Sequence, residues 1–401
     1  MSDRSAVSPP RRRRDDRLWQ LGLAVGVGAG VALSLIGRRA DRVARRGLVD
    51  WVEVETVAGR RLHRAPGGLA ADELAATEPA WAAVMGRVVP CLEVCLGTRL
   101  PGIVERHTVV DRAGWAAANM RTFRHLVERL EPALVPSSAT GLPAGGTIVA
   151  LTNRIIATQQ IGFLLGYLGT RVLGQYDVAI LSAESTPGRL LFVEDNVRQV
   201  ARQLDVPLDD MRTWIALHET THAFEFEAHP WLRPYLAERL ERLLAAFLDD
   251  TQTLRLRGLP ELLRRARQSD GDLFTSLLGA EQRRLLHETQ VVMSLLEGFS
   301  DWVMDEVGGQ LMRDVGTVRA RFEAKRATPR RGFDGLMARL SGLDLKLDQY
   351  RRGERFVAGV IAAAGVEAVE WLWSGPEALP SEAELADPAA WVRRIGRAVA
   401  A

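Results

Sequence analysis

Cysteine is scarce in this 401-residue sequence, which contains only Cys91 and Cys95. The two are four positions apart and have no second pair with which to form a four-thiolate zinc site. Their spacing favours two small apolar residues on one face of a helix, with a disulfide or a redox switch as the alternative. So little cysteine is typical of proteins from a reducing compartment.

An excess of charge of either sign is also missing. The sequence has 52 lysines and arginines against 50 aspartates and glutamates, a formal net charge of +2, and part of the positive charge lies in residues 11–14. We predict no nucleic-acid partner, because such a partner requires a broad basic surface. With 47% hydrophobic residues, the composition is that of a globular protein of one large or two medium domains. It does not indicate an oligomeric state.

The amino-terminal region contains a glycine-rich, uncharged run of 19 positions, residues 18–36. At about 1.5 Å per residue, this run just reaches the roughly 30 Å hydrocarbon thickness of a bilayer. Arginines flank both ends, so charge predicts no orientation, and no signal-peptidase cleavage site is evident. We predict a membrane anchor here, with a soluble or peripheral extension as the alternative, and a cytoplasmic catalytic domain in either case. Residues 1–17 are predicted to be a disordered basic tail.

Apolar residues at helical spacing predict a helical N-terminal lobe over residues 48–133, with Asp111 as an N-cap. A linker rich in Pro, Ser and Gly follows over residues 134–147. Residues 148–401 are then predicted to form the catalytic region. This region opens with a buried helix over residues 148–174, in which polar side chains argue against a second membrane span.

Two strands are predicted after this helix, at residues 176–183 (YDVAILSA) and 189–197 (RLLFVEDNV), joined as a hairpin. Asp209 or Asp210 is expected to cap the next helix. Beyond Pro230 the pattern is helical almost to the end, with predicted breaks near residues 258–260, 271, 308–309, 332 and 373–388. The predicted fold class is therefore α+β and predominantly α-helical, with a small sheet beside the helix that follows the hairpin.

That helix contains His218-Glu219-Thr220-Thr221-His222. Histidines four residues apart lie on one face of a helix, so both imidazoles can reach a single cation. Glu219 is rotated about 100° from His218 and can reach a water on the metal rather than the metal itself. Zinc lowers the pKa of that water towards about 7, and the glutamate takes its proton as the water attacks a carbonyl. A chance occurrence in an ordinary helix is the alternative.

A catalytic zinc requires a third protein ligand, and the best candidate is Glu297 in SLLEGFSDWVMD, residues 294–305. Glu297 and Asp301 resemble the second half of the pattern in thermolysin-like enzymes, the gluzincins. The resemblance implies that Glu297 binds zinc and that Asp301 orients His218 from outside the ligand shell. A solvated acidic helix face is the alternative.

The remaining histidines are weaker candidates. His229 precedes Pro230 and is expected to lie beyond the end of the helix, as a structural residue or a group at the rim of the active site. His287 lacks a second histidine at the required spacing. The third histidine and glycine of the metzincins are absent, so the gluzincin pattern is favoured.

Several further segments carry a resemblance that runs from about residue 49 to residue 395. The most distinctive are VDRAGW (110–115), LGQYD (173–177), GRLLFVEDN (188–196), GLDLKLDQYRRGERFV (342–357) and PEALPSEAELADPAAWV (376–392). Together with the two metal-site segments, they resemble the zincin-like metallopeptidases. Some members of that family are labelled as associated with biosynthesis of a deazaflavin coenzyme, but no phosphate-binding loop here supports flavin binding.

The resemblance also identifies one departure and one further candidate. Family members often have a histidine after the Glu-Gly pair, where this sequence has Phe299. Lys346, Gln349 and Tyr350 look like a family feature that reaches the cleft. Tyr350 could stabilise the oxyanion of the tetrahedral intermediate, or it could be a hydrogen-bonded core tyrosine.

The sequence therefore predicts a zinc-dependent metallopeptidase whose substrate is a peptide or protein. His218, His222 and Glu297 are expected to bind Zn²⁺, and Glu219 to act as general base and then general acid. In enzymes of this class an extended substrate pairs with an edge strand above the zinc helix, and residues 189–197 could serve, with a simple core or edge strand as the alternative. A zincin scaffold retained as a zinc-stabilised binding or assembly protein, without catalysis, is the alternative.

Overall fold

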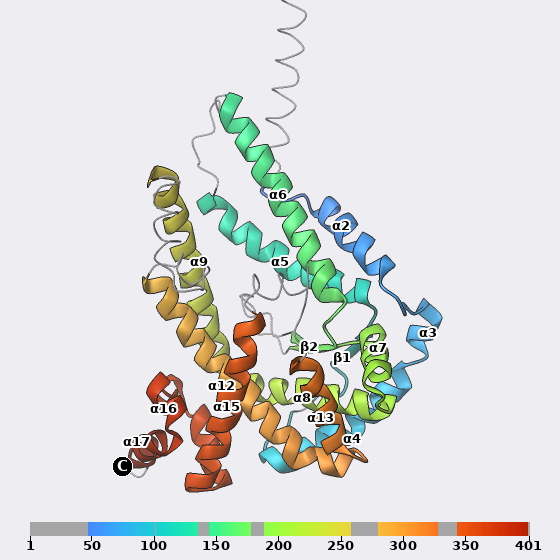
Figure 1. Cartoon of the computed structure of the whole chain (residues 1–401), viewed down its shortest axis with the longest axis vertical. Helices are drawn as coiled ribbons and strands as arrows, with labels where there is room; N and C mark the ends of the chain where they lie inside the picture. Colours follow the sequence, from blue (N-terminus) through green and yellow to red (C-terminus); the bar gives the residue numbers. More distant parts are fainter. Residues whose placement is uncertain are drawn as a thin grey trace, which may run out of the picture. The chain divides into compact units, whose positions relative to one another are not determined.

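The computed structural model describes residues 47–100, 102–134, 144–177, 188–257, 280–327 and 343–399 (Figure 1). Helices dominate these residues, and three short strands form a small mixed sheet. The predicted α+β, predominantly α-helical fold is therefore confirmed. The predicted tail (1–17) and membrane anchor (18–36) lie outside the described residues.

The chain divides into two compact units, Met1–Val57 with Val127–Leu164, and Ala58–Leu126 with Leu165–Ala401. The predicted linker does not mark this division. The helices of the first half are α2 (Trp51–Arg64), α3 (Ala71–Ala75), α4 (Glu78–Leu96), α5 (Arg112–Leu134) and α6 (Ala144–Gly169). Those of the second half are α7 (Glu194–Leu204), α8 (Leu208–Ala228), α9 (Leu232–Arg257), α12 (Ala280–Leu311), α13 (Val315–Ala327), α15 (Leu343–Ala364), the 3₁₀ helices η1 (Val366–Trp373) and η2 (Pro376–Ala378), α16 (Glu382–Ala386) and α17 (Pro388–Val399).

In the first unit, the segment that leads into α2 is bonded to α6. Arg154 donates to the Asp50 carboxylate at 3.0 Å, and the Asp50 backbone N–H donates to Thr158 Oγ1 at 2.9 Å. Helix α6 begins at Ala144, inside the predicted linker, and its burial is only partial. Ile155 is 62% exposed, so the predicted buried helix exists but presents apolar side chains to its surroundings.

The sheet has the order β1-β3-β2 and belongs to the second unit. Strand β3 (Arg189–Val193) pairs in parallel with β1 (His107–Val110) and antiparallel with β2 (Gly174–Asp177). The two strands predicted as a hairpin correspond to β2 and β3, and their antiparallel pairing is confirmed. Strand β1 was not predicted, because four residues are too few to display an alternating pattern.

The predicted second strand of the hairpin is too long. It ends at Val193, and Glu194 begins α7, because acidic residues favour the first turn of a helix. Strand β3 is also the central strand, so it cannot be the edge to which a substrate pairs. The edge strand beside the metal-site helix is β2, which packs on α8.

Some helix ends lie at the residues that the sequence predicted, and others do not. Asp111 caps α5 as predicted, since its Oδ1 accepts the backbone N–H of Gly114 at 2.6 Å. Neither Asp209 nor Asp210 caps α8, whose N-cap is Pro207. Both aspartates lie in the first turn, where they still favour the positive end of the helix. The break predicted near residues 308–309 comes slightly later, between the end of α12 at Leu311 and the start of α13 at Val315.

A buried charge network joins β3 and α7 to the neighbouring helices. The Glu194 carboxylate is fully buried and accepts hydrogen bonds from Trp81 Nε1 at 2.8 Å, from Arg198 at 2.7 Å and from Arg212. The Trp81 ring in turn stacks on Phe192 of β3, with centroids 4.1 Å apart. This carboxylate therefore fixes α4, α7 and α8 around the sheet.

Helices α4, α8, α12 and α15 all contribute buried side chains to the main core. Helices α12 and α15 lie side by side and cross at two glycines. A Cβ on Gly353 would lie 1.8 Å from the Ser294 carbonyl oxygen, and one on Gly298 would lie 2.3 Å from the Gly353 carbonyl carbon. Only glycine permits the two backbones to approach this closely. The contact therefore fixes the position of the residues that flank Gly298 on α12.

One described stretch, Ala71–Leu96, is long and apolar enough to cross a membrane by length and composition. Its side chains Trp81, Met85 and Leu92 are fully buried in the protein core. Cys91 and Cys95 lie on α4 as free thiols, one turn apart, as predicted. About a third of this apolar stretch, 33%, is buried in the protein, and Val94 is 86% exposed.

Replacing Glu194 with Gln should destabilise the protein by about 3–5 kcal/mol, because Arg212 is left as a buried charge without its partner. Urea unfolding followed by circular dichroism measures this change. Asp209→Asn is the matched control. It removes the partner of Arg87 from an ion pair whose side chains are 47% and 58% exposed, and should cost at most about 1 kcal/mol. If both variants lost the same free energy of unfolding, Glu194 would not be acting as the buried partner of Arg212.

Candidate metal centre

Helix α8 presents His218 and His222 on one face. The preceding turns, from Met211 to Leu217, are buried, so the helix is fixed against the core up to the first histidine. The two Nε2 atoms are 3.2 Å apart, and the rings meet edge to face with centroids 4.6 Å apart. The helical spacing therefore brings both imidazole nitrogens to one point.

Glu297 of α12 completes the cluster. Its Oε2 lies 3.7 Å from His218 Nε2, and the ligand atoms of His218, His222 and Glu297 all lie within 4.8 Å of one another. In a tetrahedral site with metal–donor distances of about 2.1 Å, donors are about 3.4 Å apart. Two imidazoles and one carboxylate at these separations fit a zinc ion.

The second ring nitrogen of His222 is held by two elements. Its Nδ1 lies 2.7 Å from Glu225 Oε2 on the same helix and 3.3 Å from Ser300 Oγ on α12. A carboxylate partner places the proton on Nδ1 and leaves the lone pair of Nε2 directed at the cluster. Glu225 and Ser300 therefore set the tautomer that metal binding requires.

Sequence analysis did not identify Glu225, Ser300 or Tyr176 as site residues. Glu225 follows His222 by three positions, one helical turn, and that spacing is a signal that could have identified it. Ser300 and Tyr176 reach the site through tertiary packing and leave no such signal. Asp301 lies one turn beyond Glu297 on α12 and is half-buried, and its predicted role towards His218 stays a prediction.

Glu219 is held by the edge strand rather than by its own helix. The backbone N–H of Tyr176 in β2 donates to Glu219 Oε2 at 3.0 Å. A second contact fixes β2 to the end of α8, where the Tyr176 hydroxyl donates to Glu227 at 2.8 Å. Arg106 completes this anchor with two hydrogen bonds to the same carboxylate, at 2.6 and 2.8 Å.

The close approach of β2 to α8 depends on Gly174. A Cβ at this position would lie 2.7 Å from Glu219 Cγ and 2.8 Å from Ile215 Cγ2. Both distances are far below van der Waals contact. Gly174 therefore allows the strand to lie directly against the glutamate of the motif.

The electrostatics of the cluster favour a cation. Burial raises the pKa of Glu219 to about 7, and Glu297 adds to the rise. Burial also raises the pKa of Glu225 to about 7, against the effect of His222. Burial alone would lower the pKa of His222, but the carboxylates of Glu225, Glu297 and Glu219 raise it to about 10. Three carboxylates thus converge on two imidazoles.

The other predicted residues either lie away from the three ligand atoms or have side chains that the structure does not describe. Phe299 points into an aromatic cluster, with ring centroids 5.6 Å from Trp302 and 5.4 Å from Trp373. His229 is the C-cap of α8, beyond the helix as predicted, and stacks on Trp373. His287 lies 3.5 Å from Glu382, with 42% of its side chain exposed. The side chains of Tyr350, Lys346 and Gln349 on α15 lie outside the described residues.

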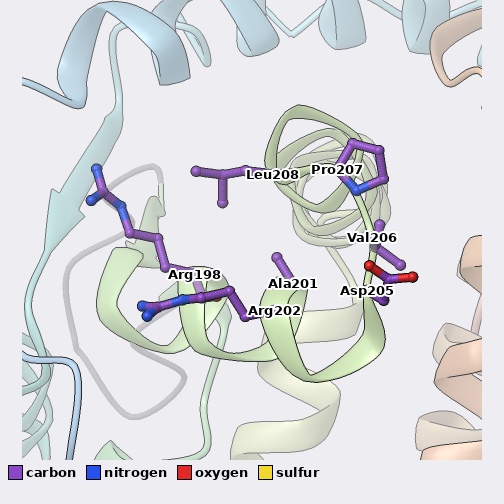
Figure 2. Close-up of a pocket in the computed structure, with 7 residues that line it drawn as sticks. All are labelled: Arg198, Ala201, Arg202, Asp205, Val206, Pro207 and Leu208. Atoms are coloured by element: carbon purple, nitrogen blue, oxygen red, sulfur yellow. The ribbon is translucent and has the colours of Figure 1, made fainter.

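A different hollow, of about 770 Å³, lies where α7 turns into α8 (Figure 2). Arg198 and Arg202 lie along one side of it, and Asp205 to Leu208 form the turn. Arg198 is paired with Glu194, Asp205 with Arg321, and Arg202 donates to the Arg198 carbonyl. None of the candidate ligands lines it.

The chain belongs to the zincin-like metallopeptidase family, whose model matches residues 49–392. Among solved structures, it is similar to one described as "a putative hydrolase with a novel fold from Chloroflexus aurantiacus". The two share 33% sequence identity with a TM-score of 0.62, over 87% of this chain and 99% of the other. No curated protein matches the chain. The family and this similar structure support a hydrolase that carries a metal, typically zinc, and the described residues include one His-His-Glu group that could hold a metal ion.

Replacing Gly174 with Ala should displace Glu219 and destabilise the protein by about 1–3 kcal/mol through overpacking. The three ligand residues should still bind a metal, since the atoms nearest to the new Cβ belong to Glu219 and Ile215. Thermal unfolding measures the loss of stability, and a crystal structure of the variant shows whether Glu219 has moved. Gly68→Ala is the control, because a Cβ there meets nothing within 4 Å. An unmoved Glu219 would refute this account.

Proposed function

We propose that this protein is a zinc-dependent hydrolase of peptide bonds, with His218, His222 and Glu297 as its metal ligands. The convergence of these three donors, with the histidine nitrogens 3.2 Å apart, is the observation that supports the proposal most. Three protein ligands leave a fourth position for water or substrate, as in catalytic zinc sites. Membership of the zincin-like metallopeptidase family supports the same reaction class.

When bound, zinc would supply a Lewis acid that polarises the scissile carbonyl and lowers the pKa of water. Glu219 takes the proton of the attacking water as general base. It then donates that proton to the amide nitrogen as the carbon–nitrogen bond breaks. The Tyr176 backbone N–H holds the carboxylate in place for both transfers. Glu225 and Ser300 keep the His222 ring in its ligand orientation.

We propose a peptide or protein as the substrate because the family is one of metallopeptidases. In the described residues, strand β2 pairs with β3 on one edge, and on its other edge the Tyr176 N–H is already bonded to Glu219. An extended substrate that paired with this strand would therefore have to replace that bond. Tyr350 as an oxyanion donor stays a prediction.

The zinc content of the purified protein, with peptidase assays on wild type and Glu219→Gln, tests the proposal. We expect one zinc per chain in both proteins, because Glu219 is not a ligand. Turnover should fall about 10²- to 10⁴-fold in the variant, through loss of general acid–base catalysis. His218→Ala should lose zinc, whereas the control His287→Ala should keep it.

Two outcomes of this experiment would decide against the enzyme. Peptidase activity unaffected by Glu219→Gln would place the chemistry elsewhere. Stoichiometric zinc without turnover on any peptide library would support the alternative, a zinc-stabilised binding or assembly scaffold. A protein side chain at the fourth coordination position in a crystal structure would support the same alternative.

Asp301 is proposed to orient His218 from outside the ligand shell. Asp301→Asn should then weaken zinc affinity about 10- to 100-fold, the usual cost of losing such a partner. Competition with a zinc chelator measures the affinity. Glu225→Gln is the comparison variant, because the hydrogen bond of Glu225 to the other histidine is present in the structure. Unchanged affinity in Asp301→Asn alone would remove Asp301 from the site.

A further inference from the structure

Tyr176 bonds strand β2 to helix α8 at two points. Its backbone N–H donates to Glu219 Oε2 at 3.0 Å, and its side-chain hydroxyl donates to Glu227 Oε1 at 2.8 Å. Glu227 follows Glu219 by two turns of the same helix, about 12 Å along the axis. One residue of the strand is therefore bonded both to the proposed general base and to a second carboxylate near the end of α8.

This second carboxylate is itself held from the other strands of the sheet. Arg106 donates to both oxygens of Glu227, at 2.6 and 2.8 Å, and to the Gly188 carbonyl oxygen at 2.8 Å. Arg106 immediately precedes β1, and Gly188 immediately precedes β3. A bidentate pair of this kind is strong and fixes the direction of both groups. Because the side chains of the pair are only 21% and 20% exposed, salt and water screen it less than a surface ion pair.

The Tyr176 side chain is also fixed by packing. A Cβ on Gly188 would lie 2.4 Å from Tyr176 Cζ and 2.5 Å from its hydroxyl oxygen, so the ring lies directly against that glycine. The ring of Phe226 packs against it with centroids 6.0 Å apart. Burial raises the pKa of Tyr176, and the Glu227 carboxylate adds to the rise. The hydroxyl therefore stays protonated at neutral pH and remains a donor to Glu227.

Neighbouring side chains of β2 face different helices, as expected for a strand. Gln175 faces α5, where it accepts hydrogen bonds from Trp115 Nε1 at 2.7 Å and from Asn119 at 3.1 Å. Tyr176 faces α8. The strand has only four residues, so a change at one of them moves the whole strand. The backbone N–H that holds Glu219 is therefore placed in part by the hydroxyl of the same residue.

We propose that Glu227 and Arg106 are positioning residues for Glu219 and act on it through Tyr176. Arg106 holds the Glu227 carboxylate, Glu227 holds the Tyr176 hydroxyl, and the Tyr176 N–H holds Glu219. Neither Glu227 nor Arg106 belongs to the His-His-Glu group. The effect on turnover rests on the proposed function, in which Glu219 is the general base. A misplacement of about 1 Å in such a group can cost about 10²-fold in rate.

Steady-state peptidase kinetics of Tyr176→Phe test the proposal. This variant keeps the ring against Gly188 and loses the donor to Glu227. We expect kcat to fall about 10- to 100-fold with a smaller change in KM, because Glu219 acts in the transition state. Zinc content should not change. The matched control is Tyr235→Phe, the same substitution on α9, which should keep the wild-type kcat.

Variants of Glu227 show whether the carboxylate is the group that matters. Glu227→Ala removes the acceptor of Tyr176 and should lower kcat as much as Tyr176→Phe does. Glu227→Gln still offers an oxygen to the Tyr176 hydroxyl and should recover part of the loss. A Glu227→Gln variant no more active than Glu227→Ala would contradict the role of the hydroxyl bond.

A double-mutant cycle separates positioning from a general loss of structure. In the Glu219→Gln background the general base is absent, so adding Tyr176→Phe should change the residual turnover by less than about twofold. A structural effect on the metal cluster or on substrate binding would lower turnover by the same factor in both backgrounds. That result would overturn the proposal.

Hydrogen exchange tests the same link without any turnover. The chain contains four tyrosines, so labelling with ¹⁵N-tyrosine gives four backbone signals, and that of Tyr176 is assigned by its loss in Tyr176→Phe. The Tyr176 amide should exchange faster in Glu227→Ala and in Arg106→Gln than in wild type. Tyr235→Phe should leave its exchange unchanged.

The two measurements distinguish failure of this inference from failure of the proposed function. Wild-type turnover with unchanged Tyr176 exchange in Glu227→Ala would overturn the inference alone. If the wild type hydrolyses no peptide, the proposed function fails, whereas faster exchange in Glu227→Ala would still support the link from Glu227 to the bond that holds Glu219.

Discussion

The Nδ1 atom of His222 is the point on which the geometry of the metal cluster depends. It contacts Glu225 on its own helix and Ser300 on α12, the helix that also carries Glu297. The same contacts therefore fix the tautomer of one ligand and the position of the helix that supplies another. If the His222 ring turned away, its Nε2 would leave the cluster and α12 would lose a polar contact with α8.

Three glycines allow the surrounding elements to pack closely enough to hold the groups of the candidate site in position. Gly174 lets the edge strand reach Glu219, and Gly298 and Gly353 let α12 and α15 cross with their backbones in contact. Gly174 lies against Glu219 itself, and Gly298 is next to the candidate ligand Glu297. The position of Glu297 is therefore tied to a contact between two helix backbones, which cannot relax as side chains can.

The sequence predicted what depends on local spacing and could not predict what depends on packing. His218, Glu219 and His222 follow from one helical repeat, and a family resemblance identified Glu297, which meets them in the structure. Strand β1 was missed because it gains its partner more than 80 residues later. The sequence predicts one strand over residues 189–197, but Glu194 is held by the buried Arg212 and starts a helix. Contacts of this kind leave no periodic signal.

The parallel pairing of β1 with β3 has a consequence for synthesis on the ribosome. His107 pairs with Leu190, so β1 leaves the exit tunnel long before β3, its partner in the described residues, exists. At about 5–20 residues per second, the delay is on the order of several seconds. During this interval, Val109 and the buried face of α4 do not yet have β3 to pack against. The nascent chain therefore passes through a stage at which it would be a substrate for chaperones, before helices α8 and α12 have been made.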